Sequence, residues 1–194
     1  MEACPYWFVK VVTIFVRTAL PKSFKGLSMK VEIKQVSKER KETLANLLEK
    51  YNYEFSQYDK RQFNDNGLFG YKYLNNYFTD SDRFAYFIYA DNLLAGFALI
   101  NKYHECERPI DWSIAEFFVS YNFRRQGVAT DAVRQIFEIH KGYYHIKYHK
   151  KNEASAVLWN SVAKKYSNNS YEICVGDEPF DDGTEATVLF FEVK

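Results

Sequence analysis

The sequence predicts an α/β domain in which helices cover both faces of a mixed β-sheet. Segments with the alternating apolar and polar residues of strands are interspersed with segments whose apolar residues recur every three or four positions, as in helices. Two strand-like runs at 84–90 and 93–101 are separated only by Asp91-Asn92, a pair that tolerates the positive φ values of a tight hairpin. The chain has 194 residues, the usual size of one domain, so we expect a single domain with a substantial core.

The first elements are expected from residue 30 onward. Residues 30–36 alternate apolar and charged side chains, which is the period of a half-buried strand. Ser37 is suited to cap the amphipathic helix that follows. Between residues 52 and 77 the pattern is poor and predicts a short helix followed by an irregular segment or a strand. The apolar stripe of the amphipathic helix consists of Leu44, Leu47, Leu48 and Tyr51.

The middle of the chain contains the hairpin and a clear strand, turn and helix. Gly96, within the second hairpin strand, suggests a bulge or close packing against a neighbour. A polar loop at 105–109 precedes an apolar and aromatic strand at 110–119. After a basic turn, apolar residues from Val128 onward recur on one helical face, and Gly142 lies where that helix would end.

The last third of the chain is expected to contribute three strands and one helix. Tyr144, Ile146 and Tyr148 alternate with polar residues, as in a strand, and Asn152 is expected to cap the next helix. Two closing strands, 171–175 and 187–193, flank an acidic loop. We interpret this loop as a solvated turn in preference to a cation site. Its acidic residues are Asp177, Glu178, Asp181 and Asp182.

The turn before Val128 has the properties of an anion-binding site. The first turn of a helix carries N–H groups without intrahelical partners and the positive end of the helix dipole, and both stabilise a phosphate. Gly127 permits close approach, and Arg124 and Arg125 add positive charge. The turn has one Gly and no Lys, which excludes the nucleotide P-loop and the three-glycine dinucleotide loop. The sequence therefore predicts a phosphate-bearing cofactor.

The stretch Arg124-Arg125-Gln126-Gly127-Val128-Ala129 resembles the acyl-CoA loop of the GNAT family of N-acetyltransferases. The family pattern is Gln or Arg, two residues, Gly, one residue, then Gly or Ala. The resemblance covers the chain from about Met29 onward and is most specific between Glu116 and Trp159, where it is similar to a poorly characterised bacterial branch. It implies the acyl-CoA N-acyltransferase fold, whose central sheet is mixed and mostly antiparallel.

The resemblance also implies that acetyl-CoA is bound as a co-substrate. The main chain around Phe118 and Val119 would pair with the pantetheine arm and offer an N–H to the thioester oxygen. The turn would hold the pyrophosphate, while Asn152 and Trp159 match family positions near the reacting sulfur. The expected cofactor-binding residues are Phe118, Val119, Arg124, Arg125, Gln126, Gly127, Val128, Ala129, Thr130, Asn152 and Trp159.

Glu116 is the candidate catalytic base. It is the only acid inside the apolar run SIAEFFV, where burial would raise its pKa and allow it to accept a proton from an amine, directly or through water. The alternative is that Glu116 faces solvent or pairs with a lysine. Many family members have Tyr at the place of Trp159 to protonate the departing thiolate, and an indole N–H is not acidic enough for that role. Solvent, Ser155 or Tyr166 would serve instead, or no acid is needed.

Two functions follow from these residues. The first is an N-acetyltransferase that passes the acetyl group of acetyl-CoA to a primary amine by direct attack in a ternary complex. The alternative is an acyl-CoA-binding sensor or interaction module without turnover. The sequence does not identify the acceptor, whose pocket the resemblance assigns to residues 52–77, and it leaves open whether the chain forms a homodimer.

Composition excludes several other partners. The net charge of +1 argues against a nucleic-acid-binding protein, so the 16 Tyr and 17 Phe are interpreted as a bulky core and surface. Three widely spaced cysteines without a CxxC pair indicate neither disulfides nor a zinc site, as expected in a reducing cytoplasm. His145 and His149 are interpreted as a solvated strand face, because the cation Lys147 between them disfavours a metal.

Residues 1–28 are expected to be an extension in front of the domain at residues 29–194. The apolar run WFVKVVTIFV follows Glu2, is interrupted by Lys10 and lacks a small-residue cleavage site, unlike a signal peptide. It is also too short to cross a membrane. Met29 precedes the natural first strand, which suggests that Met29 is the usual start.

Overall fold

The computed structural model describes residues 29–104 and 108–194. The predicted extension at residues 1–28 and part of the predicted polar loop lie outside the described residues. Among the helices of the described part, none has the length and apolar character of a bilayer-spanning segment.

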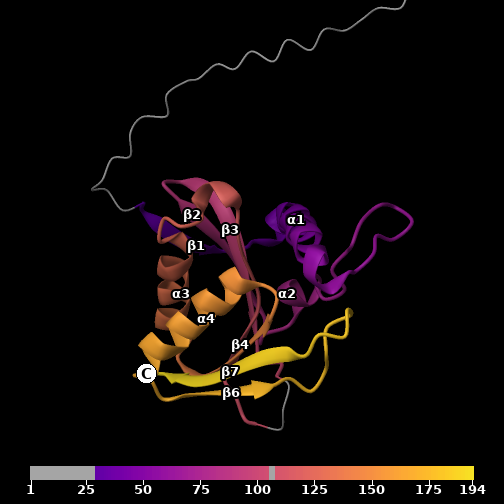
Figure 1. The fold of residues 1–194 in the computed structure, drawn as a ribbon. Coiled ribbons are helices and arrows are strands. Elements are labelled where there is room, and N and C mark those ends of the chain that lie inside the picture. The colour runs from indigo at the N-terminus through magenta and orange to yellow at the C-terminus, as the bar shows by residue number, and fades with distance from the viewer. Residues whose placement is uncertain (1–28, 105–107) are drawn as a thin grey trace, which may run out of the picture.

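In the part of the chain that the structure describes, seven strands form one sheet through the middle of the molecule (Figure 1). The strand order is β1-β2-β3-β4-β5-β7-β6, and every neighbouring pair is antiparallel except β4 and β5. The predicted mixed, mostly antiparallel sheet is thus confirmed. The strands are β1 (Val31–Gln35), β2 (Phe84–Ala90), β3 (Leu93–Asn101), β4 (Trp112–Val119), β5 (Gly142–His149), β6 (Tyr171–Val175) and β7 (Ala186–Val193).

Helices cover both faces of this sheet, as predicted. On one face, α1 and α2 pack on a core cluster that includes Leu44, Phe97 and Phe118. On the other face, α3 and α4 pack on clusters that include Ile136 and Trp159 (Figure 1). The helices are α1 (Lys41–Asp59), α2 (Asn76–Thr79), α3 (Val128–Ile139) and α4 (Glu153–Tyr166), with short 3-10 turns η1 (Lys38–Arg40) and η2 (Tyr121–Phe123).

The helix α1 differs from its prediction at both ends. Ser37 precedes the 3-10 turn η1 and makes no side-chain cap hydrogen bond. The helix then runs through to Asp59, so the helical part predicted after residue 52 is the continuation of α1 and not a separate short helix. The irregular segment predicted after it is confirmed, because residues 60–75 form no regular element. The second half of α1 is stabilised by distant aromatic residues, since the ring of Tyr51 lies 5.9 Å from Phe97 and 6.2 Å from Phe118. Such contacts leave no signal in the local sequence pattern.

The hairpin of β2 and β3 is confirmed in detail. Asp91 and Asn92 have φ values of 48° and 65°, as a tight turn requires. The predicted close packing at Gly96 is also confirmed, because a Cβ atom there would lie 1.9 Å from the carbonyl oxygen of Phe118 on β4. A register irregularity between β2 and β3 adjoins this glycine. The absence of a side chain lets β3 and β4 approach closely just before the basic turn.

The prediction of a solvated histidine face on β5 is wrong. His145 and His149 are only 3% and 0% exposed, because β5 is an inner strand between β4 and β7. The acidic loop is likewise less solvated than predicted. Its Asp182 side chain, 6% exposed, accepts hydrogen bonds from Thr184 and contacts His149 and Lys151. These bonds keep the pKa of Asp182 well below its usual range.

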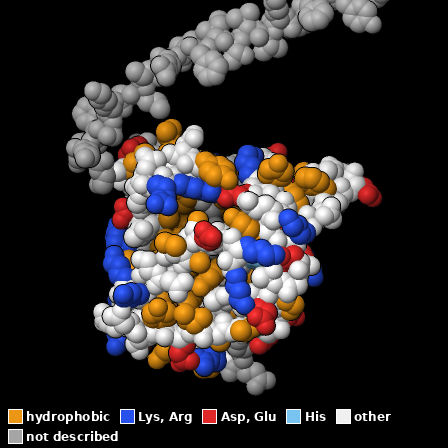
Figure 2. Space-filling model, in the orientation of Figure 1, with side chains coloured by type: hydrophobic (Ala, Val, Ile, Leu, Met, Phe, Trp, Pro, Cys, Tyr) orange, Lys and Arg blue, Asp and Glu red, His pale blue; other side chains and the backbone are white. Residues whose placement is uncertain are grey.

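Charges of both signs are scattered among apolar side chains on the face shown in Figure 2. This distribution agrees with the net charge of +1.

Candidate active site

The strands β4 and β5 part along most of their length. Each has eight residues, yet only Trp112 with Tyr144 and Ser113 with His145 are paired. The other edge of β5 is fully paired with β7. Among the described residues, the second half of β4 therefore has an edge without a strand partner, and we call the space beside it the β4–β5 opening.

Along β4, the backbone N–H and C=O groups of alternate residues face this opening. The amide of Ser120 donates to the carbonyl oxygen of Ala95 at 2.8 Å, which sets the phase of the antiparallel ladder with β3. By this alternation, the peptide groups of Phe118 face β3, while those of Phe117 and Val119 face the opening. Of the two residues predicted to pair with a ligand, only Val119 faces it. Phe117, which was not among the predicted residues, faces the opening as well, and period-two alternation along the strand could have indicated it.

The predicted start of a helix at the basic turn is confirmed. Gly127 precedes α3 with a φ of 83°, in the left-handed region that favours glycine. The first amides of the helix, those of Val128, Ala129 and Thr130, have no intrahelical acceptor by the geometry of an α-helix. The side chain of Val128 is buried in the core, so it leaves these amides uncovered. The turn thus has the geometry of an anion site.

Replacing Gly127 with Ala is expected to cost about 1 kcal/mol of unfolding free energy, because the φ of 83° strains a residue with a Cβ atom. No atom of the described residues lies within 4 Å of the added Cβ, so the cost arises from the backbone conformation. Urea denaturation measures it. Gly127→Asn is the control and should lose less, since Asn tolerates this conformation. Equal losses in both variants would contradict the explanation.

The three polar side chains of the turn differ in their surroundings. The side chain of Arg124 donates three hydrogen bonds within the protein: two of 2.8 Å to Glu54 and one of 2.6 Å to the carbonyl oxygen of Val119. Gln126 donates to the carbonyl oxygen of Asn122 at 2.6 Å. Arg125 is exposed and has a positive φ of 62°. Of the two arginines predicted beside a phosphate, Arg125 is therefore the exposed one.

Glu116 lies on the face of the sheet covered by α1 and α2. It is partly buried, and the side chains of Tyr51 and Tyr71 hydrogen bond to its carboxylate. Burial raises the pKa of Glu116 above its ordinary value, although the two tyrosines and the positive charge of Arg61 oppose this shift. Its hydrogen-bond partners are thus tyrosines, and no lysine pairs with it among the described residues.

Two more residues extend this cluster. The Nδ2 of Asn101 donates to the hydroxyl of Tyr77 at 3.2 Å, and Tyr77 hydrogen bonds to Tyr71. The Oδ1 of Asn101 accepts from the amide of Tyr103 at 3.0 Å, which fixes the orientation of the Asn101 side chain. Sequence reasoning placed Tyr51 on a helical stripe only and gave no role to the others, because no local pattern connects them.

Asn152 and Trp159 are both on α4. The Oδ1 of Asn152 accepts from the amide of Ser155 at 3.1 Å, so the predicted cap is confirmed. Trp159 is 4% exposed and packs edge-on against Phe117, with ring centroids 5.3 Å apart. This contact places the indole beside the strand edge that faces the opening. The hydroxyl of Tyr166 is buried and has no hydrogen-bond partner in the described part of the chain.

The end of β5 closes against α1 and the loop between β6 and β7. The ring of His149 lies 5.8 Å from that of Tyr58 and 4.5 Å from that of Phe180. Its Nδ1 accepts from the amide of Lys151 at 3.1 Å, and its Nε2 lies 3.3 Å from Asp182. Both ring nitrogens are therefore engaged. Within residues 29–104 and 108–194, no group of three or more His, Cys, Asp or Glu side chains is suited to hold a metal.

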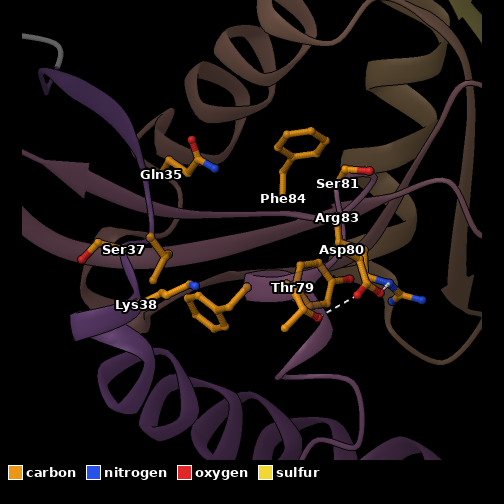
Figure 3. Close-up of a pocket in the computed structure, with 11 residues that line it drawn as sticks. Gln35, Ser37, Lys38, Thr79, Asp80, Ser81, Arg83 and Phe84 are labelled. Atoms are coloured by element: carbon orange, nitrogen blue, oxygen red, sulfur yellow. Dashed lines mark hydrogen bonds and ion pairs between the residues drawn. The ribbon is translucent and has the colours of Figure 1, made fainter.

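A separate hollow of about 550 Å³ lies between β1, α2 and the start of β2 (Figure 3). Arg83 on its wall is paired with Asp80 at 3.3 Å. The strands β2 and β3 separate β1 from β4, so this hollow is distinct from the β4–β5 opening. It shares only Tyr77 with the residues around Glu116.

Solved structures share this fold at low sequence identity. An acetyltransferase from Thermus thermophilus has a TM-score of 0.59 and 10% identity, over 86% of this chain and 99% of the other. An acetyl transferase from Salmonella typhimurium that modifies the N-terminal serine of ribosomal protein L7/L12 has a TM-score of 0.57 and 15% identity, over 84% and 95%. The PaiA N-acetyltransferase from Thermoplasma acidophilum, solved with coenzyme A, has a TM-score of 0.53 and 12% identity, over 84% and 99%. No curated protein matches the chain.

A family comparison covers the site itself. The model of the acetyltransferase (GNAT) family matches residues 42–160, which is more than half of the chain. The matched part runs from α1 to α4 and includes Glu116, the basic turn and Trp159. The resemblance recognised in the sequence is thereby confirmed, and the chain belongs to the acetyltransferase (GNAT) family.

Proposed function

We propose that this N-acetyltransferase takes the acetyl group from acetyl-CoA and transfers it to a primary amine, with Glu116 as the base. The observation that carries the proposal is the position of Glu116 on β4, within the strand half whose other edge borders the opening. A carboxylate whose pKa is raised by burial is suited to accept a proton near neutral pH. The family assignment supports the acetyl donor.

Three parts of the chain would bind the donor. The amides at the start of α3, together with the exposed Arg125, would hold the pyrophosphate. The peptide groups of Phe117 and the N–H of Val119 would pair with the pantetheine arm in the β4–β5 opening, since the carbonyl oxygen of Val119 already accepts from Arg124. Trp159 would line the arm near the sulfur. Coenzyme A in the PaiA structure, which has the same fold, supports this choice of ligand.

The residues of the chain then have separate roles in acyl transfer. Acetyl-CoA supplies an acetyl thioester. Glu116 accepts a proton from the amine, so that the nitrogen lone pair can form the new C–N bond as the C–S bond breaks. A strand-edge N–H donates to the oxygen that gains charge. The thiolate takes a proton from solvent, since the indole of Trp159 is not an acid and Tyr166 packs against Phe137 of α3.

A thiol-release assay with a panel of primary amines tests this function, with binding of coenzyme A measured in parallel by calorimetry. The panel includes polyamines, aminoglycosides, amino acids and short peptides with free N-termini. Release of coenzyme A that depends on one amine class supports the proposal. Tight binding without release for any amine supports the alternative of an acyl-CoA-binding module, which the replacement of the family Tyr by Trp159 favours.

Replacing Tyr71 with Phe is expected to move the acidic limb of the pH–rate profile to higher pH. The hydroxyl of Tyr71 stabilises the ionised form of Glu116, so its removal raises the pKa of this carboxyl further. The measurement is kcat/KM against pH with the best amine of the panel. Tyr144→Phe is the matched control, because it also loses a buried hydroxyl, which donates to the carbonyl oxygen of His140 at 2.6 Å. An acidic limb of the pH–rate profile that shifts equally in Tyr71→Phe and Tyr144→Phe would contradict this role of Tyr71.

A further inference from the structure

Arg124 occupies the first position of the family motif, yet its side chain joins two other elements. Its Nε donates to the carbonyl oxygen of Val119 at the end of β4, at 2.6 Å. Its two Nη atoms donate to the two carboxylate oxygens of Glu54 on α1, both at 2.8 Å. Its guanidinium also lies 4.1 Å from the ring centroid of Tyr121. At least three of its five N–H donors are thus used within the protein.

The charge of Arg124 is balanced by the same contacts. The pair with Glu54 is bidentate and half-buried, with exposed fractions of 30% and 22% for the two side chains. Glu54 also raises the pKa of Arg124, opposing the effect of burial. A balanced pair contributes little net field to a phosphate at the turn. The neighbouring Arg125 is exposed and has no ion-pair partner among the residues that the structure describes.

The second half of α1, which Arg124 contacts through Glu54, contributes side chains to the site around the opening. Glu54 lies three residues after Tyr51, which bonds to Glu116, and one residue before Phe55. The ring of Phe55 lies 6.1 Å from that of His149 at the end of β5. This half of α1 therefore crosses from β4 to β5 on the face of Glu116. Arg124, through its bonds to Glu54 and to Val119, joins this half to the end of β4 beside the β4–β5 opening.

We propose that Arg124 is a positioning residue that holds the second half of α1 against β4, in contrast to Arg125, whose contact with the cofactor phosphate belongs to the proposed function. Arg124 acts through Glu54, and the pair keeps Tyr51 beside Glu116. The kinetic part of this inference rests on the proposed function, whereas its structural part does not.

The experiment compares Arg124→Met with Arg125→Met in the full chain. Arg125→Met is expected to weaken coenzyme A binding about tenfold in calorimetry and to raise the KM for acetyl-CoA correspondingly. Arg124→Met is expected to leave the Kd of coenzyme A within about threefold and to lower kcat about tenfold, because the base is mispositioned. Arg134→Met is the matched control, since it removes an arginine paired with Glu138 on α3 and should change neither quantity.

Glu54→Gln tests whether the two residues act as a pair. It should reproduce the loss in kcat of Arg124→Met, and the double variant should be no worse than either single variant. Losses in kcat that add in the double variant would show that Arg124 and Glu54 do not act as a pair. Hydrogen exchange over residues 50–59 should become faster in Arg124→Met and Glu54→Gln but not in Arg134→Met.

Two results would overturn the assignment of Arg124. One is a loss of coenzyme A binding in Arg124→Met as large as in Arg125→Met, and the other is unchanged exchange in α1. If the wild-type protein turns over no amine, the proposed function fails. The calorimetry and the hydrogen exchange then still decide the role of Arg124.

Discussion

Replacing Glu116 with Gln is expected to lower kcat/KM on the order of 100-fold, which is the usual contribution of a general base. The amide keeps the shape of the carboxylate and can still accept hydrogen bonds from Tyr51 and Tyr71, but it cannot take a proton from the amine. The wild-type rate should rise with pH as Glu116 ionises, because only the ionised form is a base. The variant should lack this acidic limb. Stopped assays of thiol release over a range of pH provide the measurement.

Two controls separate this effect from unfolding and from loss of the donor. Burial raises the pKa of Glu116, so its ionised form destabilises the folded state above the ordinary carboxyl pKa. Glu116→Gln should therefore unfold at the same or a higher urea concentration at neutral pH, and the Kd of coenzyme A should not change. Glu138→Gln, an exposed substitution on α3, should retain full activity. Full turnover by Glu116→Gln at every pH would remove Glu116 from the mechanism.

Replacing Gly96 with Ala is expected to reduce the unfolding free energy by about 3 kcal/mol, the upper part of the range for overpacking. The added Cβ would lie 1.9 Å from the carbonyl oxygen of Phe118 and 3.1 Å from the Cα of Val119. Both are backbone atoms, which cannot move aside as a flexible side chain would. The two strands must separate, and the part of β4 that faces the opening moves with them. Coenzyme A binding should therefore weaken together with stability.

Gly67→Ala is the control for this substitution. Gly67 has a φ of 71°, and within residues 29–104 and 108–194 no atom lies within 4 Å of an added Cβ, so Ala there costs about 1 kcal/mol through backbone strain. Urea denaturation of the two variants compares a steric cost with a conformational one. A loss at Gly96 no larger than at Gly67 would show that β3 and β4 can adjust.

Local patterns predicted the elements whose structure depends on local forces. The start of α3 after Gly127 follows from a three-to-four-residue apolar spacing and a glycine suited to a positive φ. The hairpin turn follows from Asp91 and Asn92, which adopt positive φ at little cost. The length of α1 was underestimated because Phe97 and Phe118, which stabilise its second half, lie on strands much later in the chain.

The pairing of side chains around the site could not be predicted from local patterns. Arg124 and Glu54 are 70 residues apart, and the sequence pattern of the turn suggested a phosphate ligand instead. The burial of His149 was missed for the same reason, since Phe180 and Asp182 reach it from another loop. A period-two pattern predicts that residues alternate between faces, but not which strand or helix covers each face.

Residue type and spacing were sufficient to predict the family, the mixed sheet with helices on both faces, the position of the basic turn and Glu116 as the acid in the strand. These features depend on spacing and residue type along a short stretch of chain. The folded structure was needed to show that β4 and β5 part after two residue pairs and that Tyr51 and Tyr71 face Glu116. It also showed that Arg124 is engaged by Glu54 while Arg125 is exposed. The physical reason is that burial and charge pairing depend on distances between segments, which are set when the sheet assembles.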